Sequence, residues 1–267
     1  MNGALFGHTW RSQRIRLGLI SLALLVWGGL LPFIYATFGS RFKSLLESGL
    51  MPAQFARFGG GDVFTLTGTV ALSLIHPVPM ILISVFAVGF SSYAIAGERQ
   101  QGTLEVVLAR PLDRRTFYVT LLLASFGFVA IAIAMLLGGT IIGSSLAGVL
   151  AELPLQRMPL VWLNGVLLFG AFATIGLAAS SSFDRAAPAL GWTLGIVIVM
   201  YVLEVLGSFW PDAAFLQPYS LFHYLRPKAV LTGAAEASDF ALLAIVIVVA
   251  MVWAIAVFPR RDLAAPI

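Results

Sequence analysis

The 267-residue sequence is too apolar for a soluble domain, since 60% of its residues are hydrophobic, only 10% are charged and its mean hydropathy is +0.96. It contains no cysteine, which excludes disulfides, thiolate metal sites and cysteine catalysis. Its formal charge of +4 suits anionic lipid head groups, and no other feature resembles a nucleic-acid site. We therefore expect membrane lipids, and no nucleic acid, as partners.

This composition predicts an all-α integral membrane protein whose residues 1–267 form a single transmembrane domain. A helix needs about 20 apolar residues to cross the hydrocarbon core, and six stretches reach this length. The predicted spans are 17–38, 66–96, 114–150, 160–183, 187–207 and 239–258. His76-Pro-Val-Pro79 predicts a break in the second span. Residues 39–62 and 208–238 are the predicted external loops.

The basic residues predict how the chain is oriented, because short cytoplasmic loops retain arginine and lysine. Placing both termini inside makes ten of the 16 basic residues cytoplasmic: Arg11, Arg14, Arg16, Arg99, Arg110, Arg114, Arg115, Arg185, Arg260 and Arg261. This N-in, C-in arrangement suits a multi-pass protein of the plasma membrane. Residues 1–16 mix apolar side chains with arginines, which indicates an interfacial helix on the inner leaflet or a frayed tail.

The segment between the second and third spans, GERQQGTLEVVLARPLDRRTF (97–117), carries seven of the 28 charged residues, which are 16 basic and 12 acidic. Thr103 can cap a short helix that Pro111 ends, and Asp113 can cap the third span. Three residues share one apolar face at helical spacing: Leu104, Val107 and Leu108. This segment can be part of an ordinary solvated loop, or it can be a helix that docks onto a cytoplasmic partner.

The same segment resembles the signature of ABC-2 type permeases, the membrane subunits of ABC exporters. The matching residues are Gly97-Glu98-Arg99-Gln100-Gln101-Gly102-Thr103-Leu104-Glu105, Leu108-Ala109-Arg110-Pro111 and Arg115. The stretch YSLFHYLRPKAVLTG (219–233) is similar to an external element that family members carry before the last span. One departure is Thr120, because the family usually has a lysine soon after the motif.

The resemblance implies that residues 98–111 form a coupling helix that seats in a groove of a separate, cytoplasmic ATP-binding subunit. That subunit would bind ATP and Mg, since neither lysine of this chain belongs to a P-loop. We therefore expect no catalytic residue, metal or cofactor here. The expected partner contacts are Glu98, Arg99, Gly102, Thr103, Leu104, Glu105, Leu108, Arg110 and Pro111. Six spans make half of a usual exporter, so a second copy or a related permease is expected.

By the same resemblance, the second and fifth spans would line a translocation path between two copies. The candidate lining residues are Ser84, Ser91, Tyr93, Thr193 and Glu204. They are the few polar groups in a mostly apolar lining, which favours a hydrophobic or amphiphilic cargo. The pairs Gly139/Gly143 and Gly191/Gly195 allow close helix packing, either within one bundle or between copies.

Two other functions are compatible with the residues. Glu204 sits at a depth where acids are often functional, although a snorkelling carboxylate is as good an explanation. With His76 it would suit a proton-coupled secondary transporter, but such carriers often show internal repeats and none is found. A scaffold that binds a regulatory protein through residues 98–115 and transports nothing is the third alternative.

Overall fold

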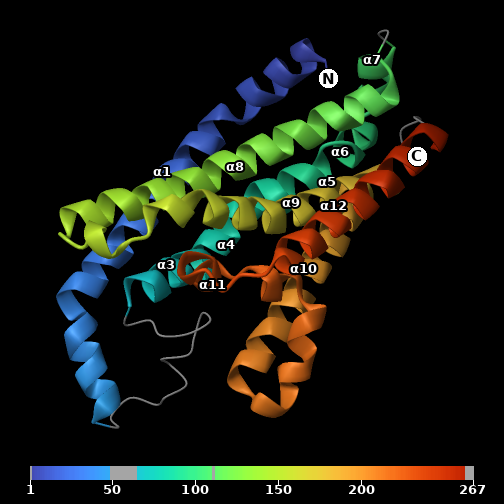
Figure 1. Ribbon diagram of the computed structural model, residues 1–267. Coiled ribbons are helices and arrows are strands. Elements are labelled where there is room, and N and C mark those ends of the chain that lie inside the picture. The colour runs from blue at the N-terminus through green and yellow to red at the C-terminus, as the bar shows by residue number, and fades with distance from the viewer. Residues whose placement is uncertain (1, 49–64, 110–111, 262–267) are drawn as a thin grey trace.

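The computed structural model describes residues 2–48, 65–109 and 112–261, and over these ranges the chain is helical with no strand (Figure 1). The α-helices are α1 (Gly3–Glu47), α3 (Leu66–Ile75), α4 (Pro77–Ser84), α5 (Ser91–Tyr93), α6 (Ala96–Gln100), α7 (Thr103–Leu108), α8 (Arg114–Leu146), α9 (Met158–Ser182), α10 (Ala186–Phe209), α11 (Pro227–Thr232) and α12 (Ala237–Val257). Between them lie a π-helix, η1 (Val85–Phe90), and the 3-10 turns η2 (Leu150–Glu152), η3 (Leu155–Arg157), η4 (Pro211–Tyr219), η5 (Leu221–Tyr224) and η6 (Phe258–Arg260).

Within the described residues, five helices are long and apolar enough to cross a membrane, and the bent run from α3 to α5 makes a sixth if it is one span. The predicted all-α multi-pass fold is therefore confirmed. Both termini and α7 lie at one end of the bundle, while α3 and α11 lie toward the other (Figure 1). An even number of crossings requires both termini to lie on the same side of the membrane. α9 runs through the middle and is the most buried of the five long helices.

The N-terminal region differs from the prediction. Residues 3–16 and 17–38 form one continuous helix, α1, rather than an interfacial helix followed by a span, and α1 also continues past residue 39, where a loop was predicted. Contacts with α8 explain the continuity. The ring of Trp10 lies 5.0 Å from that of Phe128, and the backbone N–H of Asn2 donates to Thr120 Oγ1 at 3.0 Å. Most of the predicted loop 39–62 lies outside the described residues.

Glycines allow α1 and α8 to touch through their backbones. A Cβ atom on Gly139 would lie 2.0 Å from the carbonyl oxygen of Leu25, and one on Gly143 would lie 2.2 Å from that of Gly29. Both distances are far below van der Waals contact, so only glycine fits at these two positions. The Gly139/Gly143 pair therefore serves packing inside the chain.

His76 divides the second span, as predicted. It ends α3 in an extended conformation, and its Nδ1 accepts from the N–H of Val78 at 3.3 Å, which caps α4. Pro77 then occupies the first turn of α4, where its missing N–H costs nothing. The two segments meet at 43°. Because the ring of His76 also packs 4.6 Å from that of Trp27, the structure gives this histidine a capping and packing role.

Candidate functional site

The charged segment after the second span forms two short helices, α6 and α7, instead of the single helix predicted. Gly102 separates them with φ of 72°, a left-handed conformation that costs other residues about 1–2 kcal/mol. Thr103 is the first residue of α7 and does not cap it. Its hydroxyl instead donates to the backbone oxygen of Glu98 at 3.1 Å and to the Glu98 carboxylate, which closes the turn.

The apolar face of α7 points into the chain. Leu104 is fully buried, and Leu108 is half-buried against the same cluster, which includes Phe117 of α8 and Phe258 after α12. Leu104 therefore cannot fill a groove on another subunit, which corrects the prediction. Among the described residues, the outer side is mostly polar, and its apolar exceptions are Ala109 and Val106, whose exposed fraction is 71%. Its exposed residues are Gln100, Gln101, Thr103, Glu105, Val106 and Ala109.

Arg99 was predicted to contact a partner, but its side chain is only 1% exposed. Its Nη1 donates to Asp184 Oδ1 at 3.0 Å, and Arg261 donates to the same oxygen. Partial burial alone would raise the pKa of Asp184, but the hydrogen bonds and charges of Arg261 and Arg99 outweigh it and hold that pKa below 3.8. Asp184 is thus ionised at neutral pH and holds two guanidinium groups together.

Further hydrogen bonds fix α6 to the end of α9 and to the start of α10. The hydroxyl of Ser180 accepts from the N–H groups of Ile95 and Ala96 at 3.0 and 2.8 Å, and Gln100 Oε1 accepts from the N–H of Ala186 at 3.0 Å. We call these contacts, together with the Arg99–Asp184 ion pair, the α6–α10 junction. Sequence reasoning missed it, although Asp184 and Arg185 are the only charged residues between the fourth and fifth predicted spans.

The five predicted path residues do not share one surface. Ser91 is buried, and its hydroxyl donates to Phe86 O at 3.2 Å and Ser125 Oγ at 3.3 Å. Thr193 is also buried, and it accepts from Ser92 Oγ at 3.1 Å. Neither lines an open path, because both hydroxyls join helices of the same chain.

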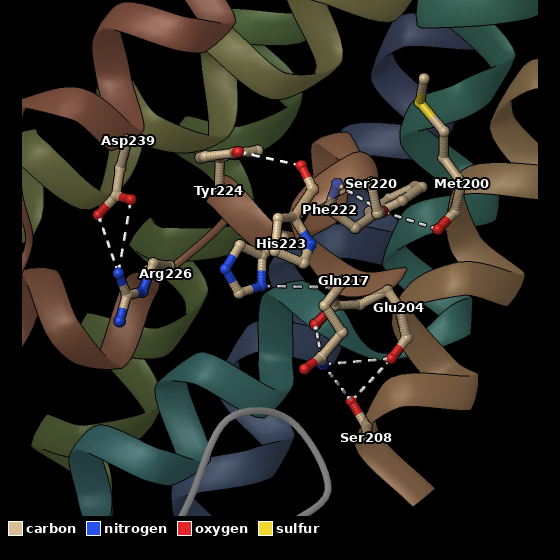
Figure 2. Close-up of polar contacts among 11 residues, drawn as sticks. Met200, Glu204, Ser208, Gln217, Ser220, Phe222, His223, Tyr224, Arg226 and Asp239 are labelled. Atoms are coloured by element: carbon tan, nitrogen blue, oxygen red, sulfur yellow. Dashed lines mark hydrogen bonds and ion pairs between the residues drawn. The ribbon is translucent and has the colours of Figure 1, made fainter. Parts of the chain in front are cut away.

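The other three path residues lie nearer to open space. Ser84 is half-buried, and Tyr93 is 45% exposed. Tyr93 and Glu98 line a cavity of about 720 Å³ between the start of α1 and the α6–α7 segment. Glu204 lines a different cavity, of about 460 Å³, between α10, the turns η4 and η5 and the helix α11. Figure 2 shows the polar contacts of Glu204. His76 is not among the residues that line it.

A bundle with five or six membrane crossings and a charged helical segment at the end where both termini lie defines a multi-pass integral membrane protein. A family model described as "ABC-2 family transporter protein" matches residues 12–263, and the chain therefore belongs to this family. It is a membrane permease component of an ABC transporter in the plasma membrane. The predicted membership of the ABC-2 type permease family is confirmed. No curated protein matches the chain at a significant level.

Proposed function

We propose that the chain is the permease subunit of an ATP-driven exporter and that the α6–α7 segment docks onto a separate subunit that binds ATP and Mg. The position of the segment carries this proposal. It lies at the end of the bundle where both termini lie, its inner side is fixed to the chain, and its outer side is exposed (Figure 1). Arg110 and Pro111, also predicted as contacts, lie outside the described residues.

The docking face is the outer side of α7. Glu105 and Val106 are exposed there, whereas Leu104 faces inward. An apolar side chain beside a carboxylate suits a groove with an apolar floor and a basic rim. Glu98 would act indirectly, because its carboxylate accepts from Thr103 and shapes the turn.

The α6–α10 junction gives the docked segment a mechanical role. Because Asp184 and Ala186 bind α6 directly, a displacement of α6 by the ATP-binding subunit would move the start of α10 together with the second span. The work of ATP hydrolysis would thus reach two spans at once. Membership of the ABC-2 family favours this function over proton-coupled transport and over a scaffold.

Co-purification in detergent with candidate ATP-binding subunits tests the docking face. We expect Glu105→Lys and Val106→Glu each to reduce the amount of bound subunit about tenfold, since each places an unfavourable charge in the contact. Asp212→Lys is the matched control, because Asp212 is exposed on η4 toward the opposite end of the bundle. Full binding by both α7 variants would contradict the proposal.

We further propose that a second copy, or a related permease, packs on α10, with lipid covering the remaining apolar surface. A Cβ on Gly191 or Gly195 would have no heavy atom of the described residues within 4 Å, and Ile198 is 57% exposed. This face of α10 is therefore open to another helix.

The absence of cysteine allows a clean cross-linking test of this interface. Mild oxidation should link Ile198→Cys into a species of twice the mass on a non-reducing gel. Val249→Cys on α12, where the valine is 63% exposed, should stay monomeric. If only Val249→Cys forms the cross-linked species, the interface would lie on α12, and the proposal for α10 would be wrong.

A further inference from the structure

The Glu204 cavity combines an apolar wall with one incompletely bonded carboxyl group. Its apolar wall includes Ile75 and Met80 of the second span, Tyr201 of α10 and Phe222 of η5. At about 460 Å³ it falls within the size range of small-molecule sites in proteins, roughly 300–1,000 Å³. The cavity lies within one chain, so it is distinct from a path between two copies.

The carboxyl group of Glu204 is bonded on one side only. Its Oε1 accepts from Gln217 Nε2 at 3.1 Å, and Gln217 is itself held by Ser208 Oγ at 3.2 Å (Figure 2). Its Oε2 is buried and accepts no hydrogen bond from any described residue. The nearest charged or titratable partner, His223 Nδ1, lies 3.8 Å away, beyond hydrogen-bonding distance. A buried carboxyl oxygen without a donor is costly, so the site favours a ligand that supplies one.

The other charges around the cavity do not satisfy this oxygen. Arg226 is paired with Asp239 at 3.4 Å (Figure 2). Burial, and then the charge of Arg226, lower the pKa of His223, so its ring is neutral at pH 7. Lys228 also lines the cavity and would repel a ligand of high positive charge.

We propose that this cavity binds an amphipathic molecule with a single ammonium group. The ammonium would donate to Glu204 Oε2, while the apolar part would pack against Phe222 and the second span. Tyr201 offers an aromatic ring to the same cation. A ligand in this position would touch α10 and the second span together, which are the elements joined by the α6–α10 junction.

Calorimetric titration of 4-phenylbutylamine into the full chain in nanodiscs tests this site. The heat of titration into empty nanodiscs is subtracted. We expect the amine to bind at least tenfold more tightly than 4-phenylbutanol, which has the same shape and no charge. Glu204→Gln should remove this preference. Lys228→Gln should strengthen amine binding, because it removes a like charge.

Asp212→Asn, a surface acid near the same end of α10 that does not line the cavity, is the matched control and should leave amine binding unchanged. Equal binding of amine and alcohol, or an unchanged preference in Glu204→Gln, would overturn the proposal. Since the assay uses neither ATP nor the ATP-binding subunit, its failure would leave the proposed coupling function intact. Failure of co-purification would in turn leave this site intact.

Discussion

Replacing Gly139 with leucine is expected to force α1 away from α8 and to destabilise the folded chain more than any other substitution considered. The added Cβ would lie 2.0 Å from the Leu25 carbonyl oxygen, and backbone atoms cannot move aside as a flexible side chain can. Overpacking a well-packed contact typically costs about 1–3 kcal/mol, and a clash with backbone atoms places this variant at the upper end of that range. This corresponds to a fall in melting temperature on the order of 10 °C for a chain of this size.

Thermal unfolding followed by size-exclusion chromatography would measure this loss. Gly138→Leu is the matched control, because it adds the same side chain one residue earlier, where a Cβ has no heavy atom of the described residues within 4 Å. We expect the control to melt close to the wild type. Equal melting temperatures for the two variants would show that the α1–α8 backbone contact is not as tight as described.

Replacing Asp184 with asparagine is expected to weaken both the fold and the coupling between α6 and α10. The substitution keeps the shape of the side chain but leaves Arg99, whose side chain is 1% exposed, without its counter-ion. Removing one partner of a buried pair costs about 3–5 kcal/mol, and because Asp184 is itself 55% exposed we expect a loss of about 1–3 kcal/mol. ATP hydrolysis by the reconstituted transporter should respond less to cargo.

The pH dependence of unfolding separates charge from packing at this site. The pKa of Asp184 is held below 3.8, so the ion pair stabilises the chain at neutral pH and this contribution is lost as the pH falls below about 4. Asp184→Asn should lack this acid-sensitive component. Arg99→Met removes the buried charge itself and should be the milder substitution. A larger loss in Arg99→Met would mean that packing of the arginine, not its charge, holds the junction.

Composition and local motifs predicted the elements of the fold. Apolar length located the membrane-crossing helices, His76-Pro77 located the break, and Asp113 caps α8 as expected, since its side chain accepts from the N–H of Thr116 at 3.3 Å. Each of these depends on residues that are neighbours in sequence. Local chemistry is sufficient to decide them.

The environment of α6 and α7 could not be predicted in this way. A helix of six residues has too few turns to show which of two apolar sides is buried, so Leu104 was assigned to the partner and Val106 was overlooked. Arg99 was assigned to the partner contact because it lies within the matching motif, and charged side chains are almost never fully buried unless they are paired. Its counter-ion, Asp184, is 85 residues away, and no pattern within the motif points to it.

The π-helix η1 has a consequence for how the second span is mapped. One extra residue in a helical turn offsets the angular phase of everything after it by roughly 100°. Ser84 and Ser91 are seven residues apart and would share a side of a regular helix, yet Ser84 is half-buried and Ser91 is fully buried. The periodic variation of side-chain accessibility along this span, measured by scanning mutagenesis, should therefore be fitted separately on each side of Val85–Phe90. A single period fitted through the whole span would assign the residues of one half to the wrong side.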